Sequence, residues 1–133
     1  MLRRCLDAIA AQSYPSMELI HIDNGSSDDS VRIVQADRQI LNAENRGFAA
    51  AVNQGVAVAR GEYVLLVNPD AFLERDYVAN CVAALERAGD RFGMATGKLY
   101  RANEPDVVDT MGIRMTRSGR HFDIQDARGR PSP

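Results

Sequence analysis

The stretch Tyr63-Val64-Leu65-Leu66-Val67-Asn68-Pro69-Asp70 decides the fold of this chain of 133 residues. Its first five residues form a nearly continuous apolar run, which is typical of a strand in the middle of a parallel sheet, where both faces are covered. Pro69 fixes its own φ angle and restricts Asn68, so the turn after the run is stiff. The sequence therefore predicts a strand over residues 63–67 that holds the carboxylate of Asp70 at its carboxyl end.

Helical and strand-like segments alternate on both sides of this stretch. Leu2, Cys5, Leu6 and Ile9 recur at helical spacing and predict an amphipathic helix at the start of the chain. Further helices are expected over residues 30–36, 48–59 and 76–88. Further strands are expected over residues 18–22, 38–41 and 92–96, with shorter ones near 107–108, 113–115 and 121–124. This alternation predicts the α/β class, with a mostly parallel sheet flanked by helices.

The composition is that of a globular domain, with 45% hydrophobic and 26% charged residues. We assign residues 1–125 to one domain and residues 126–133 to a frayed tail. The net charge of -2 lacks the basic excess of nucleic-acid-binding surfaces. The sequence has no apolar run of about 18 residues, so it predicts no transmembrane helix, and no signal peptide is recognised. Cys5 and Cys81 lack metal-ligand spacing and are interpreted as reduced core residues of a cytoplasmic protein.

Ligands of parallel α/β sheets bind outside the carboxyl ends of the strands, which directs attention to the loops after Ile22 and Val67. Asp23 begins the first loop, and its carboxylate can accept hydrogen bonds from a nucleobase edge or a ribose hydroxyl. Asn24 and Gly25 allow the tight turn that follows. The alternative is a capped turn in which the carboxylate only satisfies backbone amides.

The second candidate site is the Asn68-Pro69-Asp70 turn, in which Asp70 is a candidate metal ligand. A rigidly held carboxylate suits a hard divalent cation such as Mg²⁺ or Mn²⁺, which keeps waters and bridges to phosphate oxygens. Such a cation would neutralise a diphosphate leaving group. The alternative is an Asn-Pro-Asp turn that binds nothing, and the tripeptide alone does not decide between the two.

Asn45, Arg46 and Gly47 directly precede the helix expected over residues 48–59. A glycine before a helix leaves free backbone amides, and the start of a helix favours anions. Arg46 can pair with a phosphate, with a solvated surface arginine as the alternative. Asn53 lies among alanines and valines in the same helix and needs a partner, which we expect to be a backbone carbonyl rather than a ligand.

Three motifs in this order and spacing resemble family 2 glycosyltransferases, over about residues 2–122. The rhamnosyltransferase-like branch is the most similar, because it carries Asn-Pro-Asp where other branches carry Asp-x-Asp. The motifs are Leu19-Ile20-His21-Ile22-Asp23-Asn24-Gly25-Ser26, Asn45-Arg46-Gly47-Phe48, and Gly61-Glu62-Tyr63-Val64-Leu65-Leu66-Val67-Asn68-Pro69-Asp70.

The resemblance implies a GT-A fold, which is a Rossmann-like nucleotide-binding sheet. It implies an enzyme that transfers a sugar from a nucleoside diphosphate donor, with inversion at the anomeric carbon. Asp70 would be the metal-binding carboxylate, and Asn68 stands where another branch has its first aspartate, so metal binding is expected to be weaker. The residues that the resemblance assigns to the nucleotide-sugar site are Asp23, Asn24, Asn45, Arg46, Gly47, Asn68 and Asp70.

The resemblance also implies the partners. The donor would be a UDP- or dTDP-sugar, the cofactor Mg²⁺ or Mn²⁺, and the acceptor a saccharide or a lipid-linked saccharide. The product would belong to a cell wall or another polysaccharide. We expect a cytoplasmic protein that associates at most peripherally with the inner face of the membrane, and no nucleic-acid partner.

Two parts of the family pattern are missing. Members begin with an apolar strand before the helix that here starts at Leu2, and its absence would leave backbone groups unpaired in the sheet. A later acidic residue acts as catalytic base, and no residue here matches it, so the base is unknown. His121 is interpreted as a strand residue with a solvated edge. We therefore expect a chain truncated at both ends. The late acidic residues that match no motif are Asp106, Asp109, Asp123 and Asp126.

Two other functions stay open. A non-catalytic nucleotide-binding fragment would bind the donor without transferring its sugar. A nucleotidyltransferase also places a carboxylate at a strand end, but this chain lacks the glycine-rich, basic loop that such enzymes use near their N-terminus.

Overall fold

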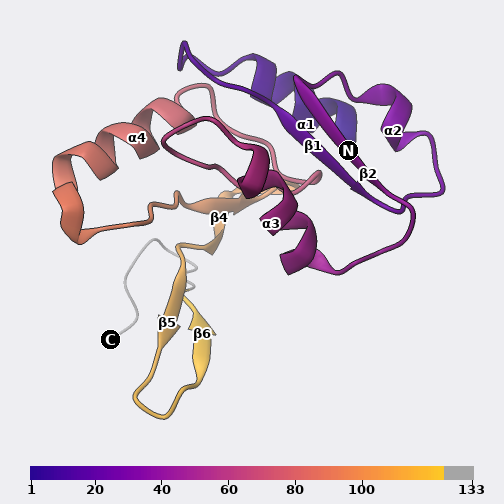
Figure 1. Cartoon of the computed structure of the whole chain (residues 1–133). Helices are drawn as coiled ribbons and strands as arrows, with labels where there is room; N and C mark the ends of the chain where they lie inside the picture. Colours follow the sequence, from indigo (N-terminus) through magenta and orange to yellow (C-terminus); the bar gives the residue numbers. More distant parts are fainter. Residues whose placement is uncertain (125–133) are drawn as a thin grey trace. The chain divides into compact units, whose positions relative to one another are not determined.

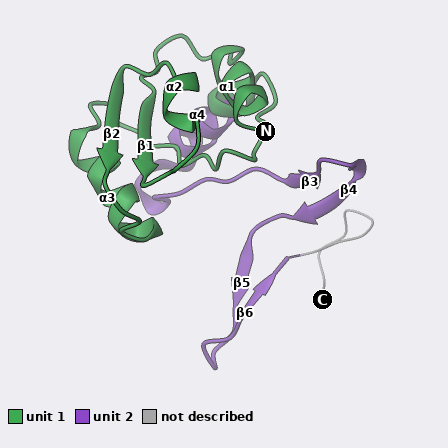
Figure 2. Ribbon diagram, turned by 90° about the vertical axis from the view of Figure 1, so that its right-hand side faces the viewer, with its two compact units in different colours: residues 1–79 green, residues 80–133 purple. Residues whose placement is uncertain are grey.

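The computed structural model describes residues 1–124 (Figure 1). The chain divides into two compact units, Met1–Ala79 and Asn80–Pro133, with the boundary inside a helix, and each unit is described by itself (Figure 2). The tail expected over residues 126–133 lies outside the described residues. The elements are α1 (Leu2–Ala10), β1 (Ile20–Asn24), α2 (Ser30–Ile33), β2 (Arg38–Asn42), α3 (Phe48–Val58), α4 (Tyr77–Ala88), η1 (Gly89–Arg91), β3 (Leu99–Arg101), β4 (Glu104–Thr110), β5 (Ile113–Met115) and β6 (His121–Asp123).

The first unit is built on β1 and β2, which pair in parallel and lie side by side in Figure 1. Their register matches Ile22 with Ile40 and Asn24 with Asn42, so both strands reach their carboxyl ends together. Helix α3 packs against β1. This contact is close because Gly55 of α3 is buried and has no side chain between the helix and Ile22.

Gln12, just after helix α1, and Arg4, within it, both contact later residues of this unit. Gln12 donates from Nε2 to the carbonyl of Glu74 over 2.8 Å, and its Oε1 accepts from the backbone amide of Val78 over 3.1 Å. The guanidinium of Arg4 stacks on the ring of Phe72, 4.0 Å from its centre. The buried apolar residues of the unit are Cys5, Val34 and Ala51.

The second unit contributes η1, the larger part of α4 and two antiparallel strand pairs, β3 with β4 and β5 with β6. The β5–β6 pair is a regular hairpin, in which Arg114 lies opposite Phe122 and Met115 opposite His121. The amide of Thr116 donates to the carbonyl of Arg120 over 2.9 Å and closes its turn. Val82 of α4 is buried.

The α/β class is confirmed, but two expected strands are wrong. Residues 63–67 and 92–96 form no ladder with any described strand, and the sheet has one parallel pair instead of several strands. An apolar run becomes a strand only where a neighbour takes up its backbone hydrogen bonds, and β1 pairs with β2 alone. Leu66 is accordingly 56% exposed. The helix expected over residues 30–36 ends early, at Ile33, because the chain becomes extended at Val34.

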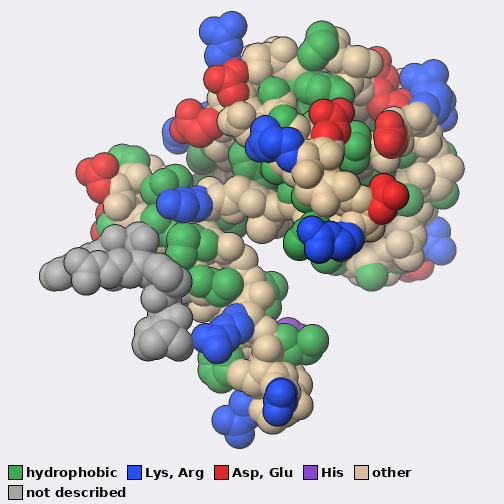
Figure 3. Space-filling model, turned by 90° about the vertical axis from the view of Figure 1, so that its left-hand side faces the viewer, with side chains coloured by type: hydrophobic (Ala, Val, Ile, Leu, Met, Phe, Trp, Pro, Cys, Tyr) green, Lys and Arg blue, Asp and Glu red, His purple; other side chains and the backbone are tan. Residues whose placement is uncertain are grey.

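The remaining predicted elements agree with the structure to within a few residues. Strand β1 begins and ends two residues later than expected, so Asp23 and Asn24 belong to the strand itself. Within residues 1–124, no helix is both long and apolar enough to cross a membrane. Acidic and basic side chains are interspersed over the face drawn in Figure 3.

Candidate functional site

Asp23 lies at the end of β1 and is 6% exposed. Its Oδ2 accepts hydrogen bonds from the backbone amides of Gly25, over 3.2 Å, and Ser26, over 3.0 Å. The hydrogen bond from the Ser26 side chain, together with these amides and the nearby His21, holds the pKa of the Asp23 carboxyl below its usual range. The carboxylate therefore caps the turn that follows β1.

Asn24 joins the end of β1 to the loop that precedes α3. Its Oδ1 accepts from the backbone amide of Arg46 over 3.0 Å, and its Nδ2 donates to Oδ1 of Asn45 over 2.9 Å and to the carbonyl of Gly47 over 3.3 Å. Oδ1 of Asn45 also accepts from the amide of Gly47 over 2.9 Å. The structure thus brings together four of the expected site residues, with Asp23 next to them in sequence.

Glycines allow the two loops to meet and the helix to begin. Gly25 has a φ angle of +84° and lies against the backbone of Glu44, in the loop before α3. Gly47 has the same φ angle, +84°, and is the N-cap residue directly before α3. An L-amino acid rarely adopts this backbone conformation, which is why the sequence has glycine at both positions.

Arg46 lies one residue before this helix start and is exposed. Its guanidinium makes no ion pair with any residue of the part that the structure describes. Its backbone is nevertheless fixed by the hydrogen bond to Asn24. The result is an available cation with an ordered main chain, next to the first free amides of an eleven-residue helix, which is an arrangement that suits an anion.

Asn68, Pro69 and Asp70 form a turn beside α1. The amide of Ala71 donates to the carbonyl of Asn68 over 3.0 Å, and the thiol of Cys5 donates to the same carbonyl over 3.6 Å. Burial, and to a lesser degree the charge of Asp70, raise the pKa of the Cys5 thiol. Both Asn68 and Asp70 are exposed. No hydrogen bond or ion pair among the described residues joins this turn to the Asn24–Asn45 cluster.

The carboxylate oxygens of Asp70 suit a cation whose other ligands are mostly water and the phosphate oxygens of a substrate. Residues 1–124 contain no group of three or more His, Cys, Asp or Glu side chains placed to hold a metal ion. Mg²⁺ typically takes one or two protein carboxylates and fills its other positions with water and phosphate oxygens. One exposed carboxylate on a stiff turn fits that pattern.

Two residues that belong to this hydrogen-bonded cluster were not predicted as site residues. Asn42, at the end of β2, and Gln54, on α3, exchange two hydrogen bonds, and Asn42 also donates to Asn24. Asn53, expected to need a partner, is exposed instead. The available signal was that both strands of a parallel pair end in asparagine; Gln54 becomes recognisable only once the orientation of α3 is known.

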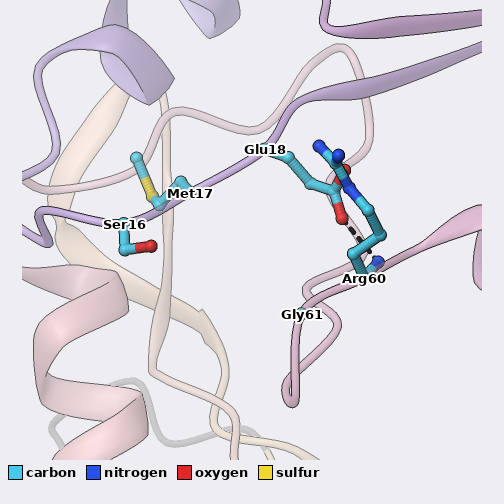
Figure 4. A pocket seen from close by; sticks show the side chains of 5 residues that line it. All are labelled: Ser16, Met17, Glu18, Arg60 and Gly61. Carbon is cyan, nitrogen blue, oxygen red and sulfur yellow. Dashed lines mark hydrogen bonds and ion pairs between the residues drawn. The ribbon is translucent and has the colours of Figure 1, made fainter.

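A pocket of about 230 Å³ lies at the other end of β1 (Figure 4). Its lining residues are Ser16, Met17, Glu18, Arg60 and Gly61. Glu18 accepts from the backbone amide of Arg60 over 2.6 Å and pairs with its guanidinium over 3.1 Å. These interactions, led by the backbone amide, keep the pKa of Glu18 below its usual range. Glu18 and Arg60 therefore neutralise each other's charge in the pocket.

Within residues 1–124, no late acidic residue is recognisable as a catalytic base. Asp109 pairs with Arg101 over 3.4 Å, and Asp123 lies opposite Ile113 in the β5–β6 hairpin. Asp126 lies outside the described residues. His121 is an exposed residue of β6, as the sequence analysis expects.

Parallel strands with a helix packed on them, and polar loops at their carboxyl ends, define an α/β protein of the type that binds ligands at that edge of the sheet. The family model "Glycosyl transferase family 2" matches residues 1–132, and the chain belongs to this family.

Three relatives illustrate the match. "Glycosyltransferase GlyA" of Streptococcus pneumoniae serotype 4 is 36% identical over 79% of this chain and 16% of its own length. "Glycosyltransferase GlyG" of the same organism is 33% identical over 79% of this chain and 36% of its own length. "Poly-beta-1,6-N-acetyl-D-glucosamine synthase" of Staphylococcus epidermidis is 34% identical over 77% of this chain and 26% of its own length. The chain thus spans less than two fifths of the length of each of these relatives.

Proposed function

We propose that this chain binds the nucleoside diphosphate of a sugar donor at the carboxyl ends of β1 and β2. The observation that carries this proposal is the Asn24–Asn45–Arg46–Gly47 cluster. It orders an exposed arginine backbone at the start of α3, where an anion is favoured. Family membership supports a nucleotide-sugar donor in general, and we propose UDP- or dTDP-sugars in particular.

Different residues of the site bind different parts of the donor. Arg46 pairs with a phosphate, because its guanidinium carries several hydrogen-bond donors. The first amides of α3 add to the positive potential at the same place. Asp23 and Asn24 lie at the strand end, where a ribose hydroxyl or a base edge is read. Asp23 already caps two amides, so it reads the donor through its remaining acceptor capacity.

Asp70, assisted by Asn68, is the proposed ligand of Mg²⁺ or Mn²⁺. When bound, the cation stabilises negative charge on the departing diphosphate. Asp70 holds it from a turn whose geometry Pro69 and the Asn68–Ala71 hydrogen bond restrict. A single protein carboxylate leaves most coordination positions to the donor's phosphates, so metal and nucleotide are expected to bind together.

The proposed reaction is direct displacement with inversion. The acceptor hydroxyl, on a saccharide or a lipid-linked saccharide, attacks the anomeric carbon while the diphosphate leaves on the opposite side. The Asn68-Pro69-Asp70 turn supports placement in the rhamnosyltransferase-like branch. Peripheral association with a membrane is part of this proposal only through a lipid-linked acceptor.

A second candidate is nucleotide binding without transfer. The observation that favours it is that no described acidic residue matches the catalytic base of the family. The base takes the proton of the acceptor hydroxyl, and transfer is slow without it. The two candidates share the donor site and differ only in turnover.

The test is titration of the chain with UDP and dTDP in the presence of Mn²⁺. We expect Arg46→Ala to weaken binding about tenfold, which is the usual loss for one hydrogen-bonded charge pair. Arg32→Ala is the matched control, because Arg32 is an exposed arginine of α2 that pairs with the exposed Asp29 over 3.6 Å. Absence of nucleotide binding by the wild-type chain, or equal loss in both variants, would contradict the proposal.

A further inference from the structure

A chain of side-chain amides runs from α3 across both strand ends to the loop that contains Arg46. Gln54 and Asn42 exchange two hydrogen bonds, from Gln54 Nε2 to Asn42 Oδ1 over 3.0 Å and from Asn42 Nδ2 to Gln54 Oε1 over 2.9 Å. Asn42 Nδ2 also donates to Oδ1 of Asn24 over 3.1 Å. We propose that Asn42 and Gln54 are positioning residues that, through Asn24, hold Arg46 where it binds the donor's phosphates. This inference rests on the proposed function.

The hydrogen bonds define the orientation of the Asn24 amide. Its Oδ1 receives two donors, Asn42 Nδ2 and the Arg46 amide, while its Nδ2 donates to Asn45. Turning the amide over would place its NH₂ group against both donors and its oxygen against the Oδ1 of Asn45. Asn42 is a second donor to Asn24 Oδ1, beside the Arg46 amide, and so stabilises the orientation in which Asn24 holds that amide.

Gln54 stabilises the same orientation of Asn42. With Nδ2 of Asn42 directed to Asn24, Gln54 gives a hydrogen bond to Oδ1 of Asn42 and accepts one from its Nδ2. A reciprocal amide pair of this type allows only matched orientations. Gln54 thus influences Arg46 through two intermediate side chains.

The network rests on regular elements and orders an exposed loop. Asn42 and Asn24 are register partners at the ends of β2 and β1, and Gln54 is held by α3, which packs against β1. All three are half-buried, whereas Asn45, Arg46 and Gly47 are exposed. The three loop residues lack buried side chains, so the amide network contributes to their order, in addition to the contact of Gly25 with the Glu44 backbone.

Amide hydrogen exchange tests this inference without any ligand. Gln54→Ala and Asn42→Ala are each expected to speed exchange of the Arg46 amide at least about threefold, because local opening becomes easier. Gln39→Ala is the matched control: Gln39 is also a β2 side-chain amide, but it donates to the carbonyl of Val34, over 2.7 Å. Unchanged exchange at Arg46 in both network variants would overturn the inference.

Nucleotide binding by the full chain then separates positioning from stability. UDP affinity, with Mn²⁺ present, is measured for Gln54→Ala in the wild-type and Arg46→Ala backgrounds. If Gln54 acts through Arg46, its loss weakens binding about fivefold in the first background and little in the second. Equal losses in both backgrounds would indicate a general structural role and overturn the inference. A wild-type chain that binds neither UDP nor dTDP would overturn the proposed function itself, which is a different result.

Discussion

A Cβ atom on Gly25 would lie 2.8 Å from the carbonyl carbon of Glu44, so the loop after β1 packs directly on the backbone of the loop before α3. This contact involves main chain on both sides and has no flexible side chain that could move away. The two loops that carry the proposed donor site are therefore held together at a point where only glycine fits.

Gly25→Ala should disturb this junction. A Cβ at a φ angle of +84° is strained and would also collide with the Glu44 backbone, so we expect the free energy of unfolding to fall by about 2 kcal/mol or more. Gly89→Ala is the control, because Gly89 has a φ angle of +66° and no atom within 4 Å of the added Cβ. Denaturant unfolding measures both. Equal destabilisation would mean that the contact with Glu44 contributes nothing.

The packing of α3 on β1 predicts a compensating pair of substitutions. A Cβ on Gly55 would lie 2.7 Å from Cδ1 of Ile22, the end of a flexible side chain. In Ile22→Val that methyl group is gone, so adding Gly55→Ala should then stabilise the helix by up to about 1 kcal/mol. In the wild-type background the gain in helix propensity is offset by the crowding. Equal effects of Gly55→Ala in both backgrounds, measured by urea unfolding, would contradict this packing.

Stability should fall as the pH drops below about 6.5, the ordinary pKa of histidine. Burial lowers the pKa of His21, and its Nδ1 has no hydrogen-bond partner within residues 1–124. The unfolded chain therefore binds a proton at a higher pH than the folded one, so acid favours unfolding. His21→Gln should flatten the dependence between pH 7.5 and 5.5. A dependence that stays unchanged in His21→Gln would refute the assignment.

Glu18→Gln should lower stability without weakening nucleotide binding. Glu18 holds Arg60 at the amino end of β1, away from the strand end that carries Asn24 (Figure 4). We expect a small drop in melting temperature that shrinks at high salt, because the ion pair is screened. Glu62→Gln, at an exposed position nearby, is the control. A loss of UDP affinity in Glu18→Gln would contradict the placement of the donor site at the carboxyl end of β1.

Local patterns predicted the helices well and the strands less well. Helix α3 begins at Phe48 because Gly47 interrupts the preceding conformation, which the sequence shows directly. The run over residues 63–67 has a strong strand pattern, yet it forms no ladder, because pairing depends on a neighbour that a local pattern does not contain.

The candidate site was predictable where it follows strand ends and not where it depends on register. The strand-end rule pointed to the loop that contains Asn24, and the family resemblance assigned Asn24 and Arg46 to one site. Asn42 and Gln54 join them through the pairing of β1 with β2 and the rotation of α3, neither of which is readable from the spacing of polar residues. The contacts of Asp23 show its capping role, and its role toward the donor stays a prediction.

The most direct test of the donor-site proposal is the Mn²⁺ dependence of UDP and dTDP affinity in the wild-type chain and in Asp70→Asn. Asp76→Asn, at another exposed aspartate after the turn, serves as the matched control. We predict that Mn²⁺ tightens nucleotide binding by the wild-type chain and by Asp76→Asn, and leaves binding by Asp70→Asn nearly unchanged. Equal Mn²⁺ dependence in all three proteins would contradict a diphosphate and metal site at Asp70.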